Sequence, residues 1–262
     1  METTKVLTNM PFSTYQNVWQ FIQSLEYKNE EGITYVESQI YDMLKELPED
    51  VNLLVLLLHM QIMQGRQERA KSIAYKVWEI GGEANEKIEK MYIDDLLNIG
   101  LSDMAGAALA PHIANLETSI FSYEHILLKY AVFSGNMNLL ERLLAYLPDG
   151  GKYDILRNWL ILNDECEATT HIQFIMDRLI EKIKENILGF SYNLFFDREF
   201  PEVEFVFYVD DTIKNYESLR EQMHLQISSY CSAHKIDDLI NLSVVIYPLQ
   251  RHPRQELWLP NA

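Results

Sequence analysis

The amino-acid sequence predicts a mostly α-helical protein, in which an array of helical hairpins is followed by a small C-terminal α+β domain. Two observations carry this prediction. Through the first 188 residues, apolar side chains recur at helical spacing between turn-forming residues. From Gly189 onward, aromatic and β-branched residues form two short runs, followed by an amphipathic helix and a third run. We therefore expect a helical domain over residues 1–188 and a small domain with a C-terminal tail over residues 189–262.

The helical region contains a period. Gly65, Gly100 and Gly135 lie thirty-five residues apart, and each stands between two apolar stretches of helical spacing. A glycine in such a place is typical of a helix C-terminus, because it adopts a positive φ without a clash at Cβ. The period predicts stacked hairpins, since each hairpin buries its apolar face only against its neighbours. The predicted helices span residues 52–64 and 67–80, 85–99 and 102–116, and 120–134 and 137–147.

One further hairpin is predicted on each side of these three. Residues 13–27 and 32–47 form the first pair, and residues 153–162 and 168–188 form the last. Terminal hairpins of a stack are usually irregular, because one of their faces meets water or another domain.

The spacing within the repeats resembles that of the tetratricopeptide family, which has an apolar pair in its first helix, a glycine near the turn and small residues early in its second helix. The resemblance covers roughly residues 12–150 and implies an α–α superhelical solenoid. The run Leu-Pro-Glu-Asp at residues 47–50 is similar to the family's junction between repeats, whereas Leu140 stands where the family has a small residue. The matching residues are Leu57, Leu58, Gly65, Ala70 and Ala74.

The same resemblance implies a binding surface. In tetratricopeptide arrays the first helix of each hairpin lines the concave face, and the mixed polar and apolar residues at these positions suit a peptide or a helix. The alternative is that they are ordinary solvated or packed helix residues. Carried over by register, the partner-binding positions are Asn52, Val55, His59, Met63, Lys90, Asp94, Asn98, His125, Lys129 and Phe133.

In the C-terminal region, residues 191–196 and 203–209 predict a β-hairpin. An amphipathic helix over residues 216–231 and a third strand over residues 239–247 follow, which gives a ββαβ unit. A sheet of three strands has two edges, and these are either covered within the fold or available for self-association. For the tail around Trp258 the alternatives are a mobile segment and an anchor that inserts into a groove or mediates self-association.

The charge of the chain restricts its partners. Asp and Glu number 39 against 22 Lys and Arg, a formal net charge of −17. Residues 1–188 carry 28 acidic and 16 basic side chains, and residues 189–262 carry 11 and 6. Both regions are acidic, so we expect neither nucleic acid nor a membrane as partner. We expect a protein or peptide partner. The acidic charge either serves solubility alone or, as the sharper alternative, indicates that the partner is basic.

Cysteine content and hydropathy suggest a compartment. Cys166 and Cys231 are too few for a disulfide framework and lack metal-ligand spacing, so we expect buried thiols. No apolar run is long enough to span a bilayer, and the first residues lead into no apolar segment typical of a secretion signal. The sequence therefore predicts a cytoplasmic protein.

Catalytic motifs are weak. Tyr-Val-Asp-Asp at residues 208–211 resembles the catalytic box of reverse transcriptases, but this domain is small and acidic, and the box needs a further carboxylate. We interpret residues 210–212 as a helix N-cap instead. The pairs at 30–31, 94–95 and 237–238 are interpreted as solvated charge. The histidines show no zinc-binding spacing, and the sequence contains no phosphate-binding glycine loop and no nucleophile elbow, so we expect no enzyme, no metal and no cofactor.

Three functions remain as hypotheses. The favoured one is a non-catalytic adaptor or scaffold that binds a protein or peptide through the concave face. The second is an acidic inhibitor or immunity-type protein that caps a basic partner by salt-sensitive association. The third is a metal-dependent enzyme that uses Asp210 and Asp211.

Overall fold

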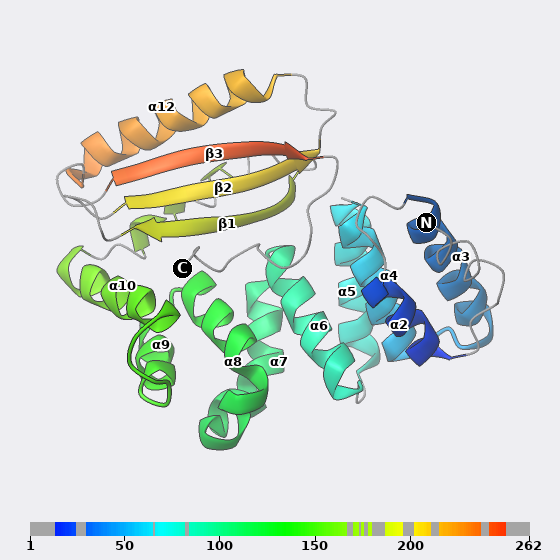
Figure 1. Cartoon of the computed structure of the whole chain (residues 1–262). Helices are drawn as coiled ribbons and strands as arrows, with labels where there is room; N and C mark the ends of the chain where they lie inside the picture. The colour runs from blue at the N-terminus through cyan, green and yellow to red at the C-terminus, as the bar shows by residue number, and fades with distance from the viewer. Residues whose placement is uncertain are drawn as a thin grey trace. The chain divides into compact units, whose positions relative to one another are not determined.

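The computed structural model describes residues 14–24, 30–64, 66–81, 84–166, 170–172, 174–175, 178–179, 187–195, 202–210, 215–236 and 241–249. The chain is mostly helical and has a small sheet near its C-terminus, as predicted (Figure 1). The described residues form two compact units, one that ends at Ile99 and one that begins at Gly100. The predicted domain boundary after residue 188 falls inside the second unit.

The first unit is built around one apolar helix. Every residue from 53 to 61 in α4 is buried, which is typical of a helix enclosed on all sides. The helices α2, α3, α5 and α6 all pack against α4, and α2 also packs against α3. The bounds are α2 Tyr15–Ser24, α3 Glu30–Glu46, α4 Val51–Met63, α5 Gln67–Ile80 and α6 Glu86–Asn98.

Short polar side chains start two of these helices. Asp50 Oδ1 accepts a hydrogen bond from the backbone N–H of Leu53 at 3.0 Å and so caps α4. The side chain of Asn85 caps α6 by accepting from the N–H of Lys87 at 3.1 Å. Such caps satisfy backbone donors that the first helical turn leaves without a partner. Asp50 and Asn85 lie thirty-five residues apart, the same spacing as the glycines.

The predicted role of the glycines is confirmed at two of the three positions. Gly100 has φ of 78° and Gly135 has φ of 66°, and each follows a helix end as the sequence predicts. After α8 the backbone N–H of Asn136 donates to the carbonyl of Ala131 at 2.9 Å, the bond that closes a left-handed C-terminal turn. Gly65 lies outside the described residues. The superhelical stacking of the hairpins stays a prediction.

A buried carboxylate joins α3 to the end of α4. Glu37 accepts hydrogen bonds from the amides of Gln61 and Gln64, each at 2.8 Å, and its ion pair with Arg66 is 3.1 Å long. Burial alone would raise the pKa of the Glu37 carboxyl, but the two amide hydrogen bonds and the charges of Arg66 and Arg69 lower it below its ordinary value of 4.5. The ionised form of Glu37 therefore stabilises the fold.

Replacement Glu37→Gln is expected to lower the free energy of unfolding at pH 7 by about 1–3 kcal/mol, since it removes a charged acceptor of several hydrogen bonds. The pKa of Glu37 is depressed on folding, so its stabilisation is present above the unfolded-state pKa and is lost as the pH falls through the folded-state pKa. The difference between Glu37→Gln and the original chain should therefore shrink at acidic pH. Urea unfolding at several pH values measures it, with the exposed Glu46→Gln of the same helix as control. A difference that is independent of pH would contradict this assignment.

The second unit begins with successive helices. Its α8 packs against α7 and α9, and α9 packs against α10. The hydroxyl of Tyr153 in α10 also donates to Glu124 of α8 at 2.7 Å. The predicted pair 85–99 and 102–116 is thus divided, because α6 lies in the first unit and α7 in the second. The bounds are α7 Ser102–Ala114, α8 Leu116–Phe133, α9 Met137–Leu144 and α10 Lys152–Cys166.

The same unit carries the sheet. Its strands lie in the order β1, β2, β3, with β1 antiparallel and β3 parallel to the central β2. Helix α12 connects β2 to β3 and packs against β3, so the predicted ββαβ order is confirmed (Figure 1). The bounds are β1 Ile187–Phe195, β2 Glu202–Asp210, α12 Tyr216–His234 and β3 Asn241–Leu249.

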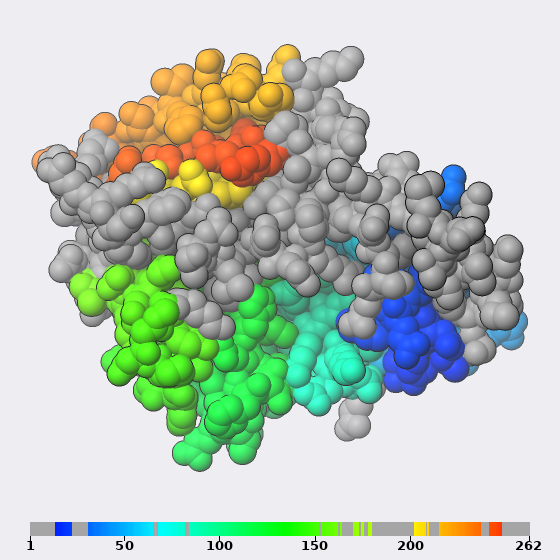
Figure 2. Space-filling model, viewed as in Figure 1, coloured from blue at the N-terminus to red at the C-terminus, as the bar shows by residue number. Residues whose placement is uncertain are grey.

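One face of β2 and β3 forms a continuous apolar surface. In register, Val203 pairs with Leu242, Phe205 with Val244 and Phe207 with Ile246, and all six side chains are buried. On α12 the residues Met223, Ile227 and Cys231 are buried at helical spacing, whereas most of its other side chains are exposed, and the helix lies at the surface (Figure 2). On the opposite face of β2, Val206 is also buried, as expected of the central strand.

Two sequence-based interpretations next to the sheet are wrong. The helix predicted to reach residue 188 ends earlier, because β1 already begins at Ile187. Asp210 is not part of a helix cap: it still pairs with Leu249 in the sheet, and the cap residue of α12 is Asn215. Strand pairing extends β2 by one residue beyond the predicted end. Asp211, Thr212 and the tail from residue 251 lie outside the described residues.

Candidate functional site

The structure places the ten predicted partner-binding residues in different environments. Asn52, Lys90, Asp94, Asn98 and Phe133 are partly exposed, and His125 is exposed. The remaining four, Val55, His59, Met63 and Lys129, are buried. This corrects the placement of Val55, His59 and Met63 on the concave surface and agrees with the alternative of packed helix residues, because α4 is enclosed by its neighbours and these three side chains are interior. The partner-binding role of the ten residues stays a prediction.

Three of the six residues that are not buried lie on α6. Lys90 donates to Glu86 at 2.7 Å, and the amide of Asn98 donates to Asp94 at 3.2 Å. These four residues are each four positions apart and so share one face of the helix. The part-exposed face of α6 is therefore a polar row whose members hold one another in place.

A buried polar contact joins α4 to α6. His59 Nδ1 lies 2.9 and 2.8 Å from the two carboxylate oxygens of Asp95, and both residues are buried. A histidine–carboxylate pair resembles the orienting half of an acid–base centre, but catalysis requires access for a substrate. At this depth the pair is a structural link between two helices.

Asp95 therefore corrects a second expectation. Asp94 and Asp95 were both predicted to be solvated, yet Asp95 is 1% exposed. Neighbouring helix positions point in directions about 100° apart, so adjacent acids can face water and the interior. His59 and Asp95 are thirty-six positions apart in the sequence, close to the thirty-five-residue period. This spacing is the sequence signal by which the contact could have been predicted.

The described residues contain no group of three or more His, Cys, Asp or Glu side chains that could hold a metal ion. Asp211, one of the two ligands in the enzyme hypothesis, lies outside them, and Asp210 ends β2. The prediction that the chain has no catalytic function stays a prediction.

Among the helices that the structure describes, none is long and apolar enough to cross a bilayer.

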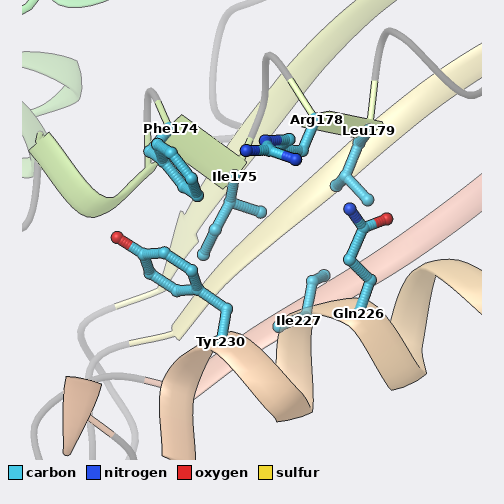
Figure 3. A pocket seen from close by; sticks show the side chains of 7 residues that line it. All are labelled: Phe174, Ile175, Arg178, Leu179, Gln226, Ile227 and Tyr230. Carbon is cyan, nitrogen blue, oxygen red and sulfur yellow. The ribbon is translucent and has the colours of Figure 1, made fainter. Parts of the chain in front are cut away.

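A cavity of about 240 Å³ opens in the second unit. One wall is formed by α12 and the other by the helical backbone at residues 170–172, 174–175 and 178–179, named here the 170–179 segment (Figure 3). We call this cavity the α12 pocket. Its described lining residues are Phe174, Ile175, Arg178, Leu179, Gln226, Ile227 and Tyr230.

Tyr230 is fixed at one end of the α12 pocket. Its ring stacks on Phe174 with a centroid distance of 4.9 Å and on His234 at 4.0 Å, and its hydroxyl lies 3.0 Å from His171 Nδ1. Burial raises the pKa of the Tyr230 hydroxyl, and the neighbouring Cys231 adds to this effect, so the phenol is neutral at physiological pH. The pocket thus has an aromatic end with a neutral hydrogen-bonding group.

Sequence reasoning missed this pocket. The sequence assigned Ile175 and Leu179 to the apolar face of one helix and Ile227 to that of another, which is correct as packing. Nothing in the sequence shows that His171, Arg178 and Tyr230 converge, because His171 and Tyr230 are fifty-nine residues apart.

An exposed aromatic pair lies on α5 in the first unit. Tyr75 is 50% exposed and Trp78 is 46% exposed, and the two residues are about one helical turn apart. Ala74, which precedes Tyr75, and Val77, which precedes Trp78, are buried. The turn before α4 lies against the same helix, since Lys76 Nζ donates to the carbonyl of Pro48 at 3.2 Å. We call Tyr75 and Trp78 the α5 pair.

Comparison with known proteins gives no match of any kind: no family model fits the chain, no curated protein is similar in sequence, and no solved structure is similar in fold.

Proposed function

We propose that this chain is a non-catalytic binding protein for a polypeptide partner with basic side chains. The α5 pair is the observation that carries the proposal. Tyrosine and tryptophan are enriched at the energetically dominant positions of protein interfaces, where a large ring is buried on binding at a low cost in entropy. Two such rings exposed side by side on one helix are expected to anchor a partner rather than to stabilise the unit.

The acidic balance of the whole chain supports a basic partner, although the exposed Lys76 also lies beside the α5 pair. Glu79 of α5 and Glu46 and Glu49 near the adjoining turn are exposed. The whole chain carries a net charge of −17. Complementary charge accelerates association and excludes acidic competitors. A basic segment with an apolar residue between the two rings would match both features.

The proposal is tested by capturing partners from a native lysate with the full chain and with Tyr75→Ala/Trp78→Ala. A captured protein is then purified, and its affinity is measured directly. Loss of two anchor residues is expected to weaken binding by about 30-fold or more. Raising the salt concentration should slow association, because the attraction between unlike charges is screened.

Two control variants separate this surface from others. Phe121→Ala/Leu225→Ala removes two exposed apolar side chains from the second unit and should leave the affinity unchanged. Lys90→Ala/Asp94→Ala/Asn98→Ala tests the predicted residues on α6. Affinity that depends on the α6 residues and ignores the α5 pair would overturn the assignment to α5. Association that ignores ionic strength would overturn the basic partner.

A further inference from the structure

We propose that the α12 pocket binds a small organic carboxylate with an apolar body. This site is separate from the α5 pair, which lies in the other compact unit. The inference therefore goes beyond the proposed binding of a polypeptide and does not rest on it.

Arg178 supplies the cation. It is the one charged side chain among the described residues that line the α12 pocket, and it forms no ion pair with any described carboxylate. Its guanidinium lies over the ring of Phe174, 5.0 Å from the centroid. Stacking on an aromatic face leaves the N–H groups at the edge of the guanidinium available, and their fork matches the two oxygens of a carboxylate. In a chain with 39 acidic side chains, an arginine that lies beside a cavity and forms no ion pair with the described carboxylates favours an anionic ligand.

Gln226 adds a second polar group. Its Oε1 is buried and accepts no hydrogen bond from the described residues. In Figure 3 the amide stands beside Leu179 on the wall formed by α12. A buried polar atom without a partner is costly, and a ligand with a hydrogen-bonding group at this end would remove that cost. The amide therefore favours a ligand that has a polar substituent in addition to its carboxylate.

The rest of the wall selects an apolar body of limited size. Ile175, Leu179 and Ile227 are buried and turn aliphatic surface toward the cavity (Figure 3). The volume of about 240 Å³ lies below the range of about 300–1,000 Å³ that is usual for drug-sized ligands. A single guanidinium balances one carboxylate, whereas a nucleotide or a polyphosphate would need more cations and more room. A monocarboxylate the size of a substituted benzoate fits both limits.

The test uses the full chain and three probes in ligand-observed NMR titrations. Benzoate and 4-hydroxybenzoate carry the charge on an apolar body, benzamide has the same shape without the charge, and acetate has the charge without the body. Both benzoates are expected to bind at least about tenfold more tightly than benzamide and acetate, the difference that one charged hydrogen-bonded pair provides. The hydroxyl of 4-hydroxybenzoate should add affinity that Gln226→Leu abolishes.

Variants assign the binding to the α12 pocket. Arg178→Gln should weaken benzoate binding about tenfold, and Arg178→Lys should recover part of the loss, because it keeps the charge but not the planar fork. Arg220→Gln is the matched control, since Arg220 lies on α12 but is exposed and paired with Glu217 at 2.8 Å. Equal affinity for benzoate and benzamide, or equal effects of Arg178→Gln and Arg220→Gln, would overturn the proposal. So would the absence of benzoate binding at about 10 mM, a concentration at which even a weak specific site is occupied.

Discussion

Replacement Asp95→Ala is expected to lower the free energy of unfolding by about 3 kcal/mol, a loss typical of a broken buried charged contact. Asp95 and His59 are 1% and 6% exposed, and their side chains meet at 2.8 Å. Alanine removes the carboxylate that both orients the imidazole and joins α6 to α4. The measurement is urea unfolding followed by circular dichroism, with the midpoint and the slope compared between the two proteins.

Asp94 offers a matched control within the same helix. Its carboxylate is partly exposed and accepts from Asn98, so Asp94→Ala should cost less than about 1 kcal/mol. The double replacement His59→Leu/Asp95→Leu should recover much of the loss, because apolar side chains of similar volume often replace a buried polar pair without a penalty. Equal losses for Asp94→Ala and Asp95→Ala would show that the buried contact contributes nothing specific.

Replacement Phe205→Ala should cost about 3–5 kcal/mol, the loss that follows removal of a large aromatic side chain from a packed core. Phe205 is completely buried at the centre of β2, where it is paired with Tyr192 of β1 and Val244 of β3. Because β2 is the central strand, a cavity there weakens both ladders. Amide hydrogen exchange is the measurement, and protection should fall in β2 and β3.

Tyr247→Ala on β3 serves as the comparison. Tyr247 is 46% exposed, so its replacement should change stability by no more than about 1 kcal/mol. If Tyr247→Ala reduced the protection of β2 as much as Phe205→Ala does, the apolar face of the sheet would not be its stabilising core.

Local chemistry made most of the elements predictable. Glycines that adopt a positive φ after a helix, as Gly100 and Gly135 do, mark helix ends. Together with helical periodicity they predict the helix ends to within a few residues of the observed ones. Runs of aromatic and β-branched residues bounded by turn-forming residues predict the strands β2 and β3 for the same reason. The errors occur at strand ends, where hydrogen bonding to a neighbouring strand decides how far a strand extends. β1 begins at Ile187 and β2 continues through Asp210 because the neighbouring strand offers hydrogen bonds there.

The candidate sites were less predictable than the elements. A register taken from the tetratricopeptide resemblance placed Val55 and Met63 on a surface, but the sequence does not show that other helices enclose α4. The polar residues of α6 were found by that register. The α12 pocket was not found, since its two walls come from distant parts of the chain.

The sequence by itself determined the mostly helical class, the ββαβ order, the turns and the acidic charge, because each depends on residues close together in the chain or on composition. Only the tertiary structure decided that Asp95 faces His59 while Asp94 faces outward, and that Arg178 lies beside a cavity and forms no ion pair with a described carboxylate. The physical reason is the same in both cases. Burial and ion pairing depend on which distant residues a side chain meets, and neither periodicity nor propensity contains that information.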